Sequence, residues 1–422
     1  MAITGLLDRM SGVRNIDRHV PLELEPTRIL REEERSPVLF QDLNGRKAAG
    51  NLWSDRDRVT EALGLQKGEL TKALLQALSS PKPVLDVKKA GFEENVKETF
   101  DLRRLPIPKY FPDDGGRYVT AGVAIAEFKG KVNVSFHRLM LLGKDRFGIR
   151  LVPRHLFTMH KMAMEKGEEL KVAFVIGTCP SVLLAAATST DYEANELEIA
   201  SALRFIGLNE GLKVRRTKYG IPVPADADYV LEGRLTSDTV SEGPFVDISG
   251  TYDVERKQPV FKVDRLYHRN DAVFQLVLPG GLEHYLLMGL PREPVIFRTV
   301  RQAVPRVHAV RLTEGGCCWL HGVVSITKNK EGDAMNAAMA AFTGHPSMKH
   351  VVIVDKDIDI FDDRQVEWAI ATRFQASRGL LVINNAAGSS LDPSTEGTTS
   401  KVAIDATKPL GDTKVFEKAV LP

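Results

Sequence analysis

Two carboxylates on either side of a Gly-Pro turn are the first candidates for chemistry in this sequence. Residues 241–253 read SEGPFVDISGTYD and contain Glu242 and Asp247. An unbroken strand would aim these side chains in opposite directions, because side chains alternate between its faces and the two acids are an odd number of residues apart. The turn at Gly243-Pro244 re-aims the chain, so both acids can face one cavity. A solvated strand face is the ordinary alternative.

Asn133, His155 and Glu196 form a second candidate set, this one for a metal ion. Their two oxygens and one nitrogen suit Mn²⁺ or Mg²⁺ better than a metal that prefers thiolates. Three ligands leave positions open for a phosphate or a water molecule. The alternative is a set of hydrogen-bonded polar residues without a metal.

The remaining motifs do not favour a nucleotide or zinc site. No GxGxxG or GxxxxGK(S/T) pattern is present, so a standard dinucleotide or P-loop site is not expected. The vicinal pair Cys317-Cys318 lacks the spacing of a CxxC zinc clip. The segment DKDID (355–359) lacks the Gly and Glu that a calcium loop requires at later positions.

The elements that must position these residues lie in the middle of the chain. Period-2 patterns predict strands there, and helical spacing predicts helices over 155–168 and 192–207. Many antiparallel strands with few helices predict a barrel-like β domain. The predicted strands cover residues 118–128, 131–142, 146–152, 170–177 and 244–254.

The two ends of the chain differ from this middle part. Residues 1–110 have a mixed α/β pattern, with helices predicted at 56–65 and 68–78. Near the other end, apolar runs at 350–360 and 379–386 flank a helical pattern at 363–374. This pattern predicts a βαβ unit with buried parallel strands. We therefore expect three domains, an α/β region (1–110), a β domain (111–298) and an α/β domain (299–422).

Composition narrows the class of protein. A chain of 422 residues is long enough for several domains, and a formal charge of +2 creates no strong field for nucleic acid. Three cysteines make no disulfide framework and fit a reducing cytosol. No apolar run approaches the length of a membrane span. We expect a soluble cytoplasmic protein that binds neither nucleic acid nor membranes.

Several ordered motifs resemble one family. NVSFHR (133–138), RLVPRH (150–155), ELEIASAL (196–203) and EGPFVD (242–247) resemble segments of the UbiD family of reversible decarboxylases, which use prenylated FMN. NLWSDRDRVTEALG, KHVVIVDKDIDIFD and GSSLDPS extend the resemblance over nearly the whole chain. It implies a multidomain α+β or α/β fold, with a central flavin-reductase-like split β-barrel flanked by an N-terminal and a C-terminal α/β domain.

The resemblance also implies roles for individual residues. Asn133, His155 and Glu196 would hold Mn²⁺, or Mg²⁺, at the flavin phosphate, with K⁺ nearby. Arg138, Glu242 and Asp247 would form the catalytic set, with Asp247 as the proton shuttle. Strict pleating would place Asn133 and Arg138 on opposite faces, so the strand must twist or bulge if both serve one site. The implied cofactor contacts are Phe136, His137, Arg138, Arg150, Leu151, Val152, His155, Leu156 and the phosphate-contacting Lys349.

Within the family, the sequence of these motifs is most similar to that of archaeal members that decarboxylate anhydromevalonate phosphate. The implied reaction converts trans-anhydromevalonate 5-phosphate to isopentenyl phosphate and CO₂ in isoprenoid biosynthesis by the archaeal-type mevalonate pathway. A decarboxylase of an aromatic acid such as a hydroxybenzoate, or a non-catalytic flavin-binding protein, is the alternative. A flavin prenyltransferase would supply the cofactor, and we expect a homo-oligomer, a dimer or a hexamer. Candidates for binding the substrate phosphate are residues 215–220, His284 and Arg292.

Overall fold

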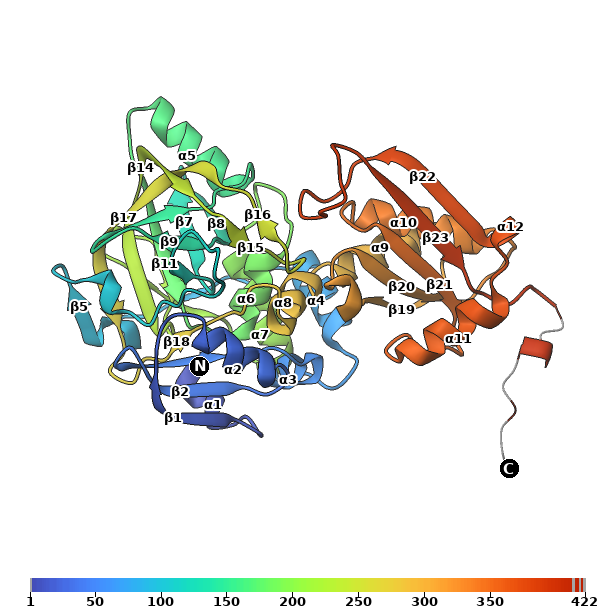
Figure 1. The fold of residues 1–422 in the computed structure, drawn as a ribbon, viewed down its shortest axis with the longest axis horizontal. Helices are drawn as coiled ribbons and strands as arrows, with labels where there is room; N and C mark the ends of the chain where they lie inside the picture. Colours follow the sequence, from blue (N-terminus) through green and yellow to red (C-terminus); the bar gives the residue numbers. More distant parts are fainter. Residues whose placement is uncertain (1, 412–413, 417–418, 420–422) are drawn as a thin grey trace. The chain divides into compact units, whose positions relative to one another are not determined.

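The chain forms two compact units, Met1–Leu287 and Met288–Pro422. The structure, a computed structural model, describes residues 2–411, 414–416 and 419. Figure 1 shows the first unit from blue to ochre and the second from orange to red. Among the described residues, no helix has the length and apolar character needed to cross a membrane.

A nine-stranded sheet is the centre of the first unit. Its hydrogen-bonded path runs from β6 to β8, and no pairing between these end strands closes it into a barrel within the described residues. Along the path the strands are β6 (Tyr118–Val119), β9 (Leu139–Leu141), β10 (Arg146–Ile149), β17 (Arg256–His268), β14 (Tyr229–Glu242), β11 (Leu170–Ile176), β7 (Val123–Phe128) and β8 (Lys131–Phe136), while β5 (Asn95–Lys97) pairs with β17.

The two longest strands of this sheet, β14 and β17, pair with each other in the antiparallel direction. Their register shifts between Glu232 and Gly233, where the ladder is irregular. A Cβ atom at Gly233 would lie 2.0 Å from the carbonyl oxygen of Lys262, so only glycine fits at this close approach. After a second register shift, between Leu235 and Thr239, the pairing continues to Glu242 opposite Arg256, which fixes where the last residue of β14 lies.

Three smaller sheets and eight α-helices, counted over the described residues, accompany this sheet in the first unit. The sheets consist of β1 (Arg14–Val20), β2 (Val38–Leu43), β3 (Arg46–Gly50) and β18 (Phe274–Gln275); of β4 (Leu85–Asp86), β12 (Lys213–Arg216) and β13 (Pro222–Pro224); and of β15 (Phe245–Val246) with β16 (Tyr252–Asp253). The helices are α1 (Ile3–Leu7), α2 (Glu25–Glu32), α3 (Arg56–Ala62), α4 (Leu70–Ser79), α5 (His155–Glu165), α6 (Pro180–Ala187), α7 (Glu196–Leu208) and α8 (Leu282–Gly289), the last of which contains the boundary with the second unit.

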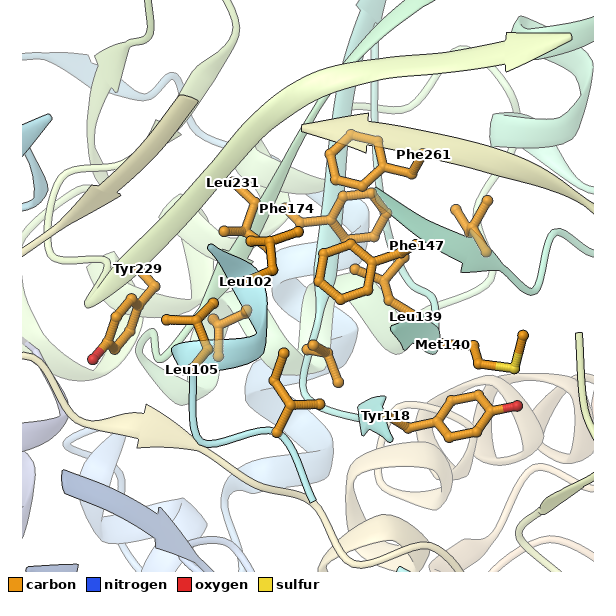
Figure 2. Packing of buried hydrophobic residues seen from close by; sticks show 14 of the residues in the cluster. Leu102, Leu105, Tyr118, Leu139, Met140, Phe147, Phe174, Tyr229, Leu231 and Phe261 are labelled. Atoms are coloured by element: carbon orange, nitrogen blue, oxygen red, sulfur yellow. The ribbon is translucent and has the colours of Figure 1, made fainter. Parts of the chain in front are cut away.

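A buried hydrophobic cluster that includes several aromatic rings lies between the strands of the nine-stranded sheet and its neighbouring loops (Figure 2). The ring centroids of Phe174 and Phe261 are 4.6 Å apart, and those of Phe147 and Phe261 are 6.5 Å apart. All three side chains are fully buried, and truncating one such ring typically costs about 3–5 kcal/mol. The cluster extends to Tyr118 and Met140, so the same core supports the strands that lead to the candidate site.

The second unit is a five-stranded sheet with helices. Its strands, in spatial order, are β19 (Val307–Leu312), β20 (His321–Ile326), β21 (His350–Asp355), β23 (Thr399–Asp405) and β22 (Leu380–Ala386). Its helices are α9 (Glu293–Ala303), α10 (Asp333–Gly344), α11 (Asp363–Arg373) and α12 (Ala376–Gly379). Val366 and Ala369 of α11 share a buried apolar cluster with Val323, Val352 and Val354 of the sheet.

Two of the expected elements are wrong in detail. The run at 379–386 was expected to be a buried parallel strand, but β22 is an edge strand, antiparallel to β23, with Leu380 and Val382 exposed. The expected strand over 244–254 is broken into β15 and β16. Gly250, with a φ of +75°, donates its N–H to the carbonyl oxygen of Asp247 and thereby closes a turn. The helices expected at 56–65, 68–78, 155–168, 192–207 and 363–374 are confirmed as α3, α4, α5, α7 and α11, with different ends.

Candidate active site

Arg138 lies in the short connection between β8 and β9, just after Phe136. Strand pleating therefore does not fix its direction, and no bulge within β8 is needed for Arg138 and Asn133 to serve one site. The guanidinium is largely buried, with 9% of its side chain exposed. Burial alone would lower the pKa of Arg138, but the hydrogen bonds and charge of Glu242 and the charge of Asp247 outweigh it and raise that pKa.

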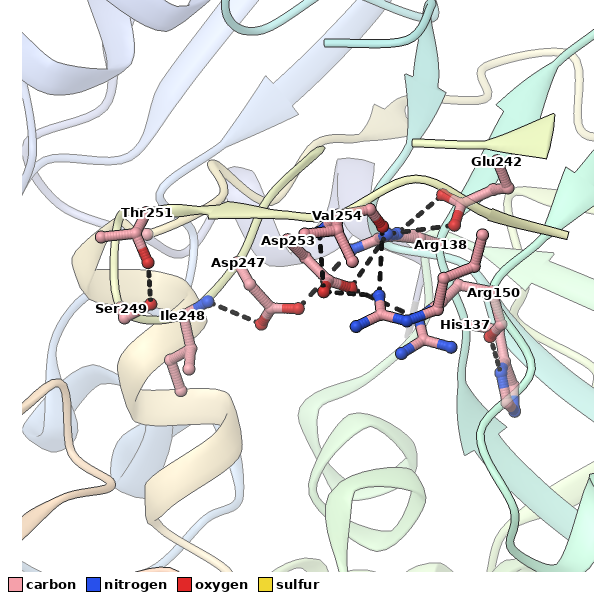
Figure 3. Close-up of polar contacts among 12 residues, drawn as sticks. His137, Arg138, Arg150, Glu242, Asp247, Ile248, Ser249, Thr251, Asp253 and Val254 are labelled. Carbon is pink, nitrogen blue, oxygen red and sulfur yellow. Dashed lines mark hydrogen bonds and ion pairs between the residues drawn. The ribbon is translucent and has the colours of Figure 1, made fainter. Parts of the chain in front are cut away.

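Glu242 is the last residue of β14 and binds Arg138 through both of its oxygens (Figure 3). Arg138 Nε donates to Oε1 at 2.8 Å, and Nη2 donates to Oε2 at 3.0 Å. The Glu242 side chain is completely buried. Such a two-pronged contact between buried charges holds the guanidinium plane in one orientation.

Asp247 lies in the turn between β15 and β16 and faces the same guanidinium. Its Oδ2 atom is 3.5 Å from Arg138 Nη1, and about a quarter of the side chain is exposed. The N–H of Ile248 donates to Oδ1 at 2.6 Å, which holds the carboxylate in place. Gly115 N–H donates to the carbonyl oxygen of Pro244 at 2.8 Å and fixes the preceding turn. The structure thus brings Glu242 and Asp247 together at Arg138, although their spacing is odd.

Asp253 is a third acid at this guanidinium, and sequence reasoning missed it. Its Oδ2 atom lies 3.4 Å from Arg138 Nη2 and 3.4 Å from Arg150 Nε. The available signal was the hairpin register, since Asp253 of β16 pairs directly with Phe245 of β15. A single strand over 244–254 hides that pairing, because it places Asp253 eight residues beyond Phe245 along one line instead of opposite it across a turn.

Two aromatic rings line the other side of Arg138. The guanidinium carbon lies 4.9 Å from the ring centroid of Phe245, which is a cation–π distance. The rings of Tyr118 and Phe245 are 4.1 Å apart. Burial, and then the negative charge of Glu242, raise the pKa of the Tyr118 hydroxyl, so it stays protonated. Apolar walls of this kind reduce the access of water to the ion pairs.

The three residues of the predicted metal set come from elements that meet at β8. Asn133 is a buried residue of β8, and both α5, which begins with His155, and α7, which begins with Glu196, contact that strand. Asn195 caps α7 by accepting the N–H of Leu197 at 3.0 Å, which makes Glu196 the first helical residue. Glu196 Oε2 accepts the N–H of Val134 at 2.9 Å, so its carboxylate lies directly against β8.

The chemistry of these donors fits a hard divalent cation. Burial raises the pKa of Glu196, whereas hydrogen bonds from Thr190, Val134 and Asn133 oppose that rise. Burial, with the charge of Arg154, lowers the pKa of His155, which favours the neutral imidazole that a metal requires. Among the described residues, no three His, Cys, Asp or Glu side chains gather as a metal site. A metal here therefore depends on the amide oxygen of Asn133.

The predicted cofactor contacts of the first unit lie on two connected segments. Leu139 of β9 pairs with Ile149 of β10, which brings Phe136 and His137 beside the segment that follows β10. That segment contains Arg150, Leu151, Val152, His155 and Leu156. His137 Nδ1 lies 2.8 Å from the carbonyl oxygen of Arg150, and burial lowers the pKa of this histidine to about 4. Leu151 N–H donates to Gln258 Oε1 at 2.8 Å.

The remaining predicted residues lie outside these two segments of the chain. Lys349 belongs to the second unit, where its Nζ atom is 2.9 Å from Asp392 Oδ2. Arg292, also in that unit, lies over the ring of Trp319 at 5.2 Å. The basic turn at 215–220 is used in ion pairs with acids, since Arg215 binds Glu93 at 2.9 Å.

Further partners of that turn support the same conclusion. Arg216 binds Glu127 at 2.7 Å and Lys218 binds Glu98 at 3.1 Å.

Of the predicted phosphate contacts in the first unit, His284 is the one near the acids. Its Nδ1 atom accepts the N–H of Gly280 at 3.2 Å, and the charge of Asp247 partly offsets the burial that lowers its pKa.

Known proteins resemble the chain over nearly its full length. Family models of 3-octaprenyl-4-hydroxybenzoate carboxy-lyase match residues 5–78 as the N-terminal domain, 84–282 as the Rift-related domain and 285–406 as the C-terminal domain. The anhydromevalonate phosphate decarboxylase of Methanosarcina mazei is 46% identical, over 99% of this chain and 98% of that protein.

Solved structures give the same result. The UbiD-class enzyme HmfF from Pelotomaculum thermopropionicum, in complex with FMN, matches with a TM-score of 0.96 and 36% identity, over 100% of this chain and 98% of that one. An evolved dimeric form of the same enzyme, in complex with prFMN, matches with a TM-score of 0.92 and 34% identity, over 100% and 97% of the two chains. The multidomain α/β architecture expected from the sequence is confirmed. The chain belongs to the UbiD family of carboxy-lyases, as its motifs predict.

Proposed function

We propose that the protein is a decarboxylase that converts trans-anhydromevalonate 5-phosphate to isopentenyl phosphate and CO₂ with prenylated FMN, in isoprenoid biosynthesis. The observation that carries this proposal is the convergence of Glu242 and Asp247 on the guanidinium of Arg138, in a chain similar to a decarboxylase named for that substrate. Loss of CO₂ from an unsaturated acid leaves negative charge on a vinylic carbon, and prenylated FMN, when bound, supplies the electron sink for that charge.

In this proposal Arg138 binds the substrate carboxylate. Its Nε atom and one hydrogen of Nη2 are occupied by Glu242, so the edge formed by Nη1 and Nη2 is the one that an incoming carboxylate meets. Glu242 keeps the guanidinium plane fixed while that edge changes partners. A guanidinium suits this task better than a lysine, because its fork matches both oxygens of a carboxylate.

Asp247 is the proposed proton donor. It lies at Nη1, the atom that the substrate carboxylate also approaches, and its side chain is the most exposed of the acids at Arg138. A carboxyl group at this place can deliver a proton to the carbon that has lost CO₂, which is general acid catalysis. Its backbone N–H, bound to the carbonyl oxygen of Thr251 at 3.0 Å, keeps the donor on a rigid turn.

The proposed cofactor site lies on the first unit. Asn133, His155 and Glu196 would hold Mn²⁺ or Mg²⁺ at the flavin phosphate, with K⁺ beside it, because a buried carboxylate, an amide oxygen and a neutral imidazole form a suitable donor set. The nine-stranded sheet would correspond to a flavin-reductase-like split β-barrel, and a flavin prenyltransferase would supply the cofactor. The flavin contacts of Phe136, His137, Arg150, Leu151, Val152 and Leu156, and the phosphate contact of Lys349, stay predictions.

Two further proposals concern the whole protein. We propose a cytoplasmic homo-oligomer, supported by three cysteines that form no disulfide in the part of the chain that the structure describes and by an exposed apolar edge strand, β22. The three-domain division at residues 110 and 298 also stays a prediction.

The test is CO₂ release by protein that is co-produced with a flavin prenyltransferase. Trans-anhydromevalonate 5-phosphate should yield CO₂ and isopentenyl phosphate, whereas protein loaded with unmodified FMN should yield neither. Hydroxybenzoates and the unphosphorylated acid form the comparison panel. A preference for a hydroxybenzoate would replace the proposed substrate with an aromatic acid, and no turnover of any acid with bound cofactor would indicate a non-catalytic flavin-binding protein.

A further inference from the structure

Asp253 lies among three guanidinium groups, which come from different segments of the first unit. Arg138 precedes β9, Arg150 follows β10, and Arg256 begins β17. Figure 3 shows the Asp253 carboxylate beside Arg138 and Arg150, and Arg256 binds it as well. One tenth of the side chain is exposed, so the contacts are largely shielded from water.

The two oxygens of Asp253 have different partners. Oδ1 accepts the N–H of Val254 at 3.0 Å and Nη1 of Arg256 at 2.5 Å. Oδ2 lies 3.4 Å from both Arg138 Nη2 and Arg150 Nε. One oxygen therefore anchors the carboxylate to the segment that follows β16, through Val254 and Arg256, while the other contacts the two arginines of the candidate site.

The charges in this cluster need such an anchor. Burial, the positive charge of Arg256 and, to a smaller extent, that of Arg138 lower the pKa of Arg150, so these guanidiniums repel one another. Burial would raise the pKa of Asp253, but the hydrogen bond from Arg256 and the charges of Arg138, Arg256 and Arg150 lower it, so the carboxylate stays ionised. An ionised carboxylate between two like charges offsets their repulsion at close range.

We propose that Asp253 is a positioning residue that sets the separation and orientation of two arginines. These are Arg138, which would bind the substrate carboxylate, and Arg150, which is expected at the flavin. The inference rests on the proposed function in that Arg138 meets the substrate. Asp253 itself acts through the arginines and transfers no proton.

The test compares the holoenzymes of wild type and Asp253→Asn, which keeps the shape of the side chain and removes its charge. We expect kcat/KM to fall about 10- to 100-fold, because a displacement of roughly 1 Å in a reacting group can cost about 100-fold. Glu255→Gln is the matched control, since Glu255 is an exposed acid of the same segment whose carboxylate accepts from Ser241. Its kcat/KM should stay close to wild type, and an equal value for Asp253→Asn would overturn the proposal.

A double-mutant cycle separates positioning from a general structural role. If Asp253 acts by setting Arg150 against Arg138, then Arg150→Gln and Asp253→Asn together should cost much less than the product of their separate losses. Strictly multiplicative losses would contradict the proposal. Arg256→Gln, at a side chain that is 37% exposed, frees the anchored oxygen and should lower kcat/KM in the same direction even if the Asn variant does not fold.

A readout without turnover makes failure of this inference distinct from failure of the proposed function. Crystal structures of unliganded wild type and Asp253→Asn, or Arg256→Gln, give the distance between the Cζ atoms of Arg138 and Arg150. We expect this distance to increase in the variants. Unchanged guanidinium positions would refute the role of Asp253, whereas absence of CO₂ release by wild type would refute the substrate and leave the role of Asp253 to the crystal structures.

Discussion

Arg138 is a buried cation whose N–H groups meet three carboxylates at unequal distances. Glu242 binds it at 2.8 and 3.0 Å, whereas Asp253 and Asp247 lie at 3.4 and 3.5 Å. An incoming carboxylate has to share the guanidinium with the looser acids, because displacing Glu242 would leave a charge without exposure to water. The unequal distances distinguish Glu242, which holds the guanidinium in place, from Asp247 and Asp253, which lie at the edge where the substrate carboxylate would bind.

Removing Glu242 should therefore destabilise the fold as well as the reaction. Glu242→Ala leaves the guanidinium of Arg138 buried without its two-pronged partner, which typically costs about 3–5 kcal/mol of unfolding free energy. Glu242→Gln keeps one hydrogen bond and should lose less. Urea denaturation of both variants measures the difference, and Glu98→Ala, at an exposed acid that pairs with Arg265, is the control with little expected change. Equal urea midpoints for wild type and Glu242→Ala would show that the pair is not needed for folding.

Replacing Asp247 tests the proton donor. Asp247→Asn keeps the hydrogen bond from Ile248 but has no acidic proton, so we expect kcat to fall by about 10² to 10⁴, the usual contribution of general acid catalysis. Incorporation of solvent deuterium into the product should fall in parallel. Asp113→Asn, at an exposed acid of the first unit, is the matched control. Deuterium incorporation at the wild-type rate in Asp247→Asn would assign the proton to another group.

At this scale the sequence predicts the acids next to the Gly-Pro turn but not the acid across the hairpin. Glu242 and Asp247 stand out because they flank a Gly-Pro turn and because acidic residues are uncommon among the apolar residues of a strand. Asp253 and Tyr118 do not flank that turn, and their place at Arg138 follows only from the pairing of β15 with β16 and the packing of Tyr118 on Phe245. Long-range pairing, not residue type, gives them their position.

At the scale of elements, the first turn of α7 positions Glu196, the carboxylate of the proposed metal set. The Asn195 cap fixes the start of the helix, and Glu196 then reaches the backbone of β8. Replacing Glu196 with Ala should abolish retention of the cofactor, because the proposed metal loses its one carboxylate ligand. Glu198→Ala is the matched control, two residues further along the helix, where the side chain accepts from Asn195 at 3.3 Å. Flavin absorbance after gel filtration is the measurement, and a wild-type spectrum for Glu196→Ala would refute the metal assignment.

Asp228 connects α1 to the rest of the first unit and should make stability depend on pH. Its oxygens accept the N–H groups of Ile3 and Val273, and burial raises its pKa to about 7. Between the ordinary pKa of an aspartate, about 4, and that value, the folded state binds the proton that the unfolded chain has released, so this group's contribution to stability decreases as pH rises through the window. Asp228→Asn should therefore gain stability relative to wild type from pH 4 to pH 7. A constant difference in melting temperature over this range would contradict the shift.

The expected elements fail where local pattern and tertiary pairing disagree. The helical spacing of apolar residues locates α3, α4, α5, α7 and α11. The apolar run of β22 has the composition of a buried parallel strand, yet the strand lies at a sheet edge, since the chain turns back after α11 and α12 and pairs with β23 in the antiparallel direction. An apolar composition usually indicates a buried strand. In β22 it does not, because the apolar residues Leu380 and Val382 of this edge strand are exposed in the single chain.

At the scale of the whole molecule, that edge bears on the predicted assembly. Leu380 and Val382 are 44% and 51% exposed on β22, and an exposed apolar edge strand is a surface that proteins normally cover. A second copy of the chain is the partner that a homo-oligomer offers, and an edge strand can extend its sheet across such an interface.

Val382→Lys should therefore lower the molar mass measured by light scattering after size exclusion, because a lysine on an edge strand disfavours pairing with another chain. Met339→Lys, at a comparably exposed apolar residue of α10 in the same unit, is the matched control and should leave the mass unchanged. A single-chain mass for the wild type would refute the homo-oligomer itself. An oligomer that persists in Val382→Lys would instead place the interface on a surface other than β22. If the variant dissociates, its activity tests whether catalysis requires assembly, since the candidate site is built from residues of the first unit.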